Sequence, residues 1–108
     1  MNLEKINKMQ LEKIKRIIIE LDASGIVRRA RVFGSSVTDE CTKDSDVDIC
    51  LELNCSTRDM RLYDLSVKID EICDYDCDLL VYDRLIEGSP IWNEIENKGV
   101  DIYVSKAS

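Results

Sequence analysis

The feature that most restricts how this chain can fold is the run DVDICLEL at 46–53, in which apolar side chains occupy every second position. Successive side chains of a β-strand point to opposite faces, so this alternation predicts a strand with one buried face. The buried face would consist of four aliphatic residues, Val47, Ile49, Leu51 and Leu53. Asp46 and Asp48 would share the opposite face, with their side chains roughly 6 to 7 Å apart along the strand.

The rest of the sequence predicts three helices and three further strands. Apolar residues spaced three and four positions apart predict helices over 3–23, 56–73 and 89–99. Short apolar runs predict strands over 29–35, 76–83 and 100–104. Gly25 would cap the end of the first helix, Ser56 or Thr57 the start of the second, and Ser89 the start of the third. This order predicts one α+β domain spanning 1–108, a small mixed sheet with its helices packed on one face.

Composition excludes several classes of function. The chain has 108 residues and a formal charge of −7, which disfavours binding to a nucleic-acid duplex. No apolar run approaches the roughly 20 residues of a membrane span, and the N-terminus lacks the core of a signal peptide. We therefore expect a cytoplasmic protein with no membrane partner.

Histidine is absent, and the five cysteines form no C-x-x-C motif. This composition disfavours both a zinc site and a disulfide framework, and it favours reduced, mostly buried thiols. It also removes Ser-His and Cys-His pairs. Any chemistry must therefore use carboxylates, hydroxyls, lysines, arginines or a bound metal ion.

The Asp46 and Asp48 pair is suited to a hard cation. Two nearby carboxylates repel each other unless a positive charge lies between them, and Mg²⁺ prefers oxygen ligands. A calcium-binding EF-hand loop starting at Asp44 is excluded, because Ile49 stands where that loop needs Gly and Cys55 where it needs Glu. By itself, D-x-D is also typical of solvated strand ends in acidic proteins.

Gly34 and Ser35 add a second signal at the end of the preceding strand. A residue without a Cβ lets the backbone approach a ligand closely. Ser35 offers a hydroxyl and, with Ser36, backbone N–H donors for a phosphate. Taken alone, the pair is an ordinary strand-to-turn Gly-Ser. Combined with ten intervening residues and Asp46-Val47-Asp48, it is a specific arrangement.

This arrangement resembles the signature of the DNA polymerase β-like nucleotidyltransferase superfamily, and in particular of the minimal nucleotidyltransferases (MNT) of bacteria and archaea. The similar segments are RVFGSS, DSDVDICL, CDLLVYDRL and IWNEIENKGVDIY, and the resemblance covers about residues 14–104. The family places a third Asp on a later strand. Asp76 and Asp78 share a face there, and we prefer Asp78 because it directly precedes the apolar run, as the family's Asp does.

The resemblance implies a polymerase β-like core with two Mg²⁺ ions and ATP as substrate. Asp46, Asp48 and Asp78 would be the catalytic metal ligands. Gly34, Ser35, Ser36 and Lys43 would bind the nucleotide phosphates. Many relatives carry an arginine-rich segment after Gly-Ser, whereas here Lys43 is the one cation of 35–45, so Arg31 or Arg84 would have to compensate.

The resemblance further implies the transfer of AMP from ATP to a hydroxyl acceptor. Many minimal nucleotidyltransferases are antitoxins paired with an HEPN toxin, and some adenylylate a tyrosine of that toxin. A chain of this size has no accessory domain for an acceptor, so a separate partner protein is expected. The alternative is a binding module with a residual site that neutralises its partner by contact. The intact aspartates favour the enzyme, and the oligomeric state stays open.

Overall fold

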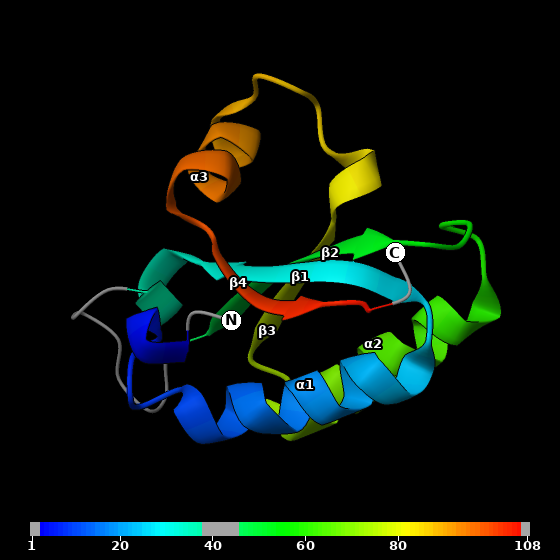
Figure 1. Cartoon of the computed structure of the whole chain (residues 1–108), viewed down its shortest axis with the longest axis horizontal. Coiled ribbons are helices and arrows are strands. Elements are labelled where there is room, and N and C mark those ends of the chain that lie inside the picture. The colour runs from blue at the N-terminus through cyan, green and yellow to red at the C-terminus, as the bar shows by residue number, and fades with distance from the viewer. Residues whose placement is uncertain (1–2, 38–45, 107–108) are drawn as a thin grey trace.

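The computed structural model describes residues 3–37 and 46–106 and contains a four-stranded mixed sheet (Figure 1). The strands are β1 (Val27–Phe33), β2 (Val47–Leu53), β3 (Cys77–Val81) and β4 (Val100–Val104), in the order β3-β2-β1-β4. β1 is antiparallel to β2 and β4, whereas β2 and β3 are parallel. The predicted α+β class and the mixed sheet are confirmed.

The main core lies between the sheet and two helices, α1 (Leu11–Ser24) and α2 (Met60–Ile72). The alternation of β2 is confirmed, because Val47, Ile49 and Leu51 are completely buried on the face that packs against these helices. The two helices contribute residues at helical spacing to the same core, namely Ile14, Ile17, Leu21, Leu62, Leu65 and Ile69.

The third helix, α3 (Pro90–Lys98), corrects the expectation that all helices share one face of the sheet. Figure 1 shows α3 on the opposite side of the sheet from α1 and α2. Its buried Ile95 packs against Phe33 of β1 and Cys50 of β2 in a second, smaller cluster. These two side chains make part of the second face apolar, and this patch gives α3 a surface on which to bury Ile95.

Local hydrogen bonds move two of the predicted helix starts. A short turn, η1 (Leu3–Lys5), precedes α1, and the Asn7 side chain accepts a hydrogen bond from the Met9 backbone N–H at 2.9 Å. Such a contact competes with helical hydrogen bonding, so α1 begins at Leu11 instead of residue 3. The α2 cap is Asp59, whose carboxylate accepts from the Arg61 backbone N–H at 2.9 Å.

The other predicted caps agree with the structure. Gly25 ends α1 with a φ of 70°, and Ser89 caps α3 by accepting from the Trp92 N–H. The four described cysteines are free thiols, two of them buried (Cys50 and Cys73), whereas Cys41 lies outside the described residues. None of the helices in residues 3–37 and 46–106 is long and apolar enough to cross a membrane.

Two isoleucines of α1 allow a matched test of this core. Ile17 is completely buried and Ile19 is 66% exposed. We expect Ile17→Ala to lower the free energy of unfolding by about 2–5 kcal/mol, because it leaves a cavity. Ile19→Ala changes the same residue type in the same helix and should stay within about 0.5 kcal/mol of the parent. Urea unfolding measures both, and equal losses would contradict the described packing of α1.

Candidate active site

The pairing of β2 with β3 brings two of the predicted aspartates together. The strands are parallel, and Asp48 lies directly opposite Asp78 in their register. Neighbouring strands are about 5 Å apart, and side chains at paired positions point to the same face. Asp48 and Asp78 therefore meet on the sheet face that carries α3, beside the small cluster that contains Ile95.

Gly34 lies at the end of β1, against the Asp48 side chain of this pair. In the antiparallel register of β1 and β2, Phe33 lies opposite Asp48, so Gly34 follows directly beside it. Gly34 has a φ of 64°, and a Cβ added to it would overlap the Oδ2 atom of Asp48. The Asp48 carboxylate therefore occupies the space left by the missing side chain of Gly34.

The pKa of Asp48 is raised from 3.8 to about 6. Burial is the largest cause, followed by the charge of Asp78, a side-chain hydrogen bond with Asp78, and the charges of Asp46 and Glu94. A hydrogen bond that raises the pKa means that protonated Asp48 donates to the Asp78 carboxylate. The site therefore carries an excess of negative charge that a proton relieves in the absence of a cation.

Asp46 stands immediately before β2 and is exposed. The alternation of β2 places it on the same face as Asp48, and its charge raises the pKa of Asp48. Asp76 is also exposed, and its backbone carbonyl accepts a hydrogen bond from the Val47 N–H at 3.0 Å. Asp76 thus helps to align the starts of β2 and β3, while Asp78 is the residue that meets Asp48.

Glu94 of α3 was missed by the sequence analysis. It is half-buried, and its charge contributes to the raised pKa of Asp48. The available signal was its place next to Ile95, the buried residue of α3. That signal becomes readable only once α3 is known to cover the face that carries Asp48.

The carboxylates fit a magnesium ion in part. In proteins Mg²⁺ is commonly held by one or two carboxylates, and substrate phosphates and water complete its shell. Asp48 and Asp78 supply such a pair of oxygen donors. Among residues 3–37 and 46–106, no three acidic or cysteine side chains converge closely enough to hold a metal ion as they stand. Asp46 would have to turn toward the pair to become a third ligand.

The predicted phosphate-binding residues surround the end of β1. Gly34, Ser35 and Ser36 belong to a short 3₁₀ turn, η2 (Gly34–Val37), although the structure does not describe the two serine side chains. Lys43 lies outside the described residues.

Neither of the two arginines that could compensate for the missing arginine-rich segment is free. Arg31 pairs with Glu96 at 3.1 Å and with Asp101 at 3.3 Å. Arg84 donates a hydrogen bond to the Thr57 carbonyl at 3.1 Å. Arg31 is therefore held by two carboxylates, whereas Arg84 is held by one hydrogen bond to a carbonyl.

Comparisons with known proteins identify the family. The model of the nucleotidyltransferase domain family matches residues 11–102, and the chain therefore belongs to this family. The protein of Methanocaldococcus jannaschii named "Putative protein adenylyltransferase MJ0435" is 30% identical over 95 residues, which cover 87% of this chain and 99% of that protein. The prediction of a nucleotidyltransferase is confirmed.

Solved structures show the same fold. A complex of the tri-AMPylated HEPN toxin of Shewanella oneidensis with an MNT antitoxin contains a chain that superposes with a TM-score of 0.64, at 19% identity, over 91% of this chain and 75% of that one. A toxin–antitoxin structure with AMP-PNP gives a TM-score of 0.57 at 18% identity, over 99% and 77% of the two chains. The chain therefore has the same α+β fold as chains of these toxin–antitoxin structures.

Because negative charge accumulates around Asp48, we expect Asp48→Asn to stabilise the protein by an amount that depends on pH. Because the folded-state pKa of Asp48 is raised, the native protein binds this proton more tightly than the unfolded chain, so its stability falls as the pH rises from about 4 to about 6. Metal-free Asp48→Asn should match the parent at pH 4 and exceed it at pH 7. Solvent screening limits the gain to about 1 kcal/mol, or a few degrees in Tm.

Thermal melts in EDTA at both pH values measure this gain. Asp83→Asn, which changes an exposed aspartate of η3 (Tyr82–Arg84), serves as the control and should leave the Tm nearly unchanged at both. A variant Asp48→Asn that is less stable than the parent at pH 7 would contradict the described repulsion.

Two glycines separate backbone strain from contact with Asp48. Gly34 and Gly25 have similar φ values, 64° and 70°, but a Cβ on Gly25 would meet nothing within 4 Å. Both alanine variants should lose about 1–2 kcal/mol of stability from strain. Gly34→Ala should also displace the Asp48 carboxylate and reduce nucleotidyl transfer by about 100-fold, while Gly25→Ala keeps the parental rate. Equal rates for the two variants would show that Gly34 does not position Asp48.

Proposed function

We propose that this chain is a Mg²⁺-dependent nucleotidyltransferase that moves AMP from ATP to a hydroxyl group of a partner protein. The observation that carries the proposal is the pairing of Asp48 with Asp78 at the starts of two parallel strands, with Gly34 against the pair. The name of the M. jannaschii relative supports a protein as acceptor. The MNT-like fold supports an HEPN toxin as that protein, which would make this chain an antitoxin. A tyrosine as the modified residue is what the family resemblance of the sequence implies.

Each candidate residue has a role in this reaction. Asp46 and Asp48 would ligate two Mg²⁺ ions, and Asp78 would complete the site on the side of the acceptor. When bound, Mg²⁺ would neutralise negative charge of the phosphate oxygens and lower the pKa of the acceptor hydroxyl. This chemistry suits a chain that has no histidine to act as a base.

The turn after β1 would bind the rest of the nucleotide. The backbone N–H groups of η2 would receive the β- and γ-phosphates, and Ser35, Ser36 and Lys43 would add side-chain contacts. The sheet would hold this turn and the carboxylates in a fixed relation, so the α-phosphate lies between them. Positioning of this kind supplies a large part of the rate in phosphoryl and nucleotidyl transfer.

The step itself is a displacement at phosphorus. The acceptor oxygen forms a bond to the α-phosphorus, and the bond from that phosphorus to the oxygen bridging to the β-phosphate breaks. Pyrophosphate leaves, and the hydroxyl proton passes to solvent. Cations in the site would offset the burial and the nearby negative charges that raise the pKa of Asp48, so this carboxylate would be ionised in the active state.

A module that neutralises its partner by contact alone is the second candidate. The observation that favours it is the commitment of Arg31 to Glu96 and Asp101, which leaves no arginine free for the triphosphate at the described part of the site. Against it stands the cost of keeping several unused carboxylates close together.

Label transfer distinguishes the two candidates. With the purified toxin partner, Mg²⁺ and ATP, label from the α-phosphate should appear on the partner, and label from the γ-phosphate should not. A kinase would give the opposite pattern. A parent protein that incorporates no label, together with an Asp46→Asn/Asp48→Asn variant that neutralises the partner equally well, would replace the enzyme by the contact module.

A neighbouring pair of residues provides the control for the third carboxylate. Asp78→Asn should abolish transfer, whereas Asp76→Asn should be far milder because Asp76 contributes its backbone carbonyl to the sheet. Far-UV circular dichroism should match the parent for both variants. The reverse order of activities would exchange the roles of the two residues.

A further inference from the structure

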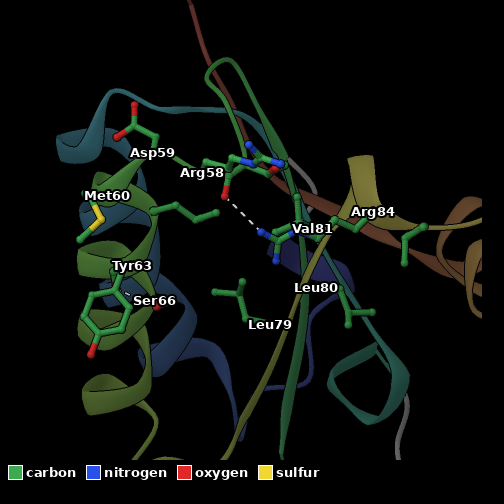
Figure 2. Close-up of a pocket in the computed structure, with 12 residues that line it drawn as sticks. Arg58, Asp59, Met60, Tyr63, Ser66, Leu79, Leu80, Val81 and Arg84 are labelled. Carbon is green, nitrogen blue, oxygen red and sulfur yellow. Dashed lines mark hydrogen bonds between the residues drawn. The ribbon is translucent and has the colours of Figure 1, made fainter.

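A cavity of about 540 Å³ lies between α2 and β3 (Figure 2). None of the three candidate metal ligands lines it. It is nevertheless connected to the site through β3, because Asp78 is followed directly by three residues that line the cavity, Leu79, Leu80 and Val81. The same five-residue strand thus borders the candidate active site at its start and the cavity further along.

The outer edge of β3 faces this cavity without a strand partner. β3 stands at the end of the strand order and, within residues 3–37 and 46–106, pairs with β2 alone. An edge strand presents a row of unpaired N–H and C=O groups, which an extended segment of another chain can join by adding a strand.

Apolar side chains line both walls of the cavity. Met60 and Tyr63 of α2, one turn apart, line the cavity and are 74% and 65% exposed. Leu79 of β3 lies between β3 and α2 (Figure 2). Large apolar side chains that stay this exposed beside a cavity are typical of a surface that a partner covers.

The cavity is also positively charged relative to the rest of the chain. Arg58 and Arg84 both line it, and neither has a carboxylate ion-pair partner among the described residues. The one acidic lining residue, Asp59, is already paired with Arg61 at 2.7 Å, and this hydrogen-bonded partner lowers the pKa of Asp59 to about 2. In a chain with a net charge of −7, two arginines at an apolar cavity indicate an occupant that carries a carboxylate.

We propose that the cavity and the outer edge of β3 form a docking groove for an extended segment of the acceptor protein. This inference rests on the proposed function. The segment would pair with β3, place an apolar side chain between Met60 and Leu79, and set a carboxylate beside Arg58 and Arg84. It would thereby be held within about three residues, or roughly 10 Å, of Asp78.

The register of β3 specifies the order of residues in this segment. Asp78 and Leu80 point to the face of the active site, and Leu79 and Val81 point to the face of α2. Paired side chains of adjacent strands share a face. The hydroxyl residue therefore lies opposite Asp78, and the apolar residues that enter the cavity lie one and three positions from it, opposite Leu79 and Val81.

The test uses a double variant of the groove and a matched double variant of α1 and the segment before it. Arg58→Glu/Met60→Glu changes two exposed lining residues and the net charge by −3. Arg16→Glu/Met9→Glu makes the same changes at exposed residues that do not line the cavity. The groove variant should raise KM for the full-length toxin partner by about tenfold or more with kcat nearly unchanged, and the control should match the parent.

Two further measurements keep this inference separate from the proposed function. The affinity of each variant for the partner, measured by calorimetry without ATP, should fall for the groove variant alone. Hydrogen exchange should slow at the β3 amides when the partner binds. If the parent binds the partner through these residues but transfers no label, the proposed function fails and the groove stands.

Three outcomes would overturn the groove. The first is an unchanged KM and affinity for Arg58→Glu/Met60→Glu while the parent transfers label. The second is β3 amides that exchange equally fast with and without the partner. The third outcome is found by sedimentation: the parent dimerises, and the groove variant is monomeric with an unchanged KM. This result would assign the groove to a second copy of this chain.

Discussion

The contact between Asp48 and Asp78 is the interaction around which the second face of the sheet is arranged. It is unfavourable in the metal-free protein, because burial of Asp48 and the nearby charge of Asp78 both raise the pKa of Asp48. The fold enforces it from the other face, where Val47 and Ile49 are completely buried and fix the position of β2. Since the core holds the backbone, the two carboxyl groups cannot separate by moving the strand. A proton or a cation between them would relieve the repulsion.

The sequence predicted the parts of this site that depend on local pattern. The alternation of 46–53 correctly divided β2 into a buried face and a carboxylate face, and the spacing from Gly34 to Asp48 correctly indicated that the two belong together. The choice of Asp78 as the third aspartate came from family resemblance instead, and the parallel register that sets it opposite Asp48 was not predicted, because strand pairing depends on contacts between residues far apart in the sequence.

What the sequence did not predict depends on tertiary contacts or on competing local ones. The side of the sheet taken by α3, and with it Glu94, follows from the contact of Ile95 with residues of two different strands, Phe33 and Cys50. No periodicity within α3 contains that information. The start of α2 was missed for a local reason, because Asp59 both caps the helix and pairs with Arg61, which Ser56 and Thr57 do not do.

The charges on the α3 face are balanced at one end and unbalanced at the other. Away from the site, three carboxylates each have an arginine, in the pairs Arg28–Glu52 (2.7 Å), Arg29–Asp101 (2.9 Å) and Arg31–Glu96 (3.1 Å). Around Asp48, the described neighbours that act on its pKa are all acidic. A face that needed its carboxylates only for stability would pair them throughout, as the first end does. The end around Asp48 instead gathers carboxylates, which supports the proposed role in binding metal ions together with a nucleotide.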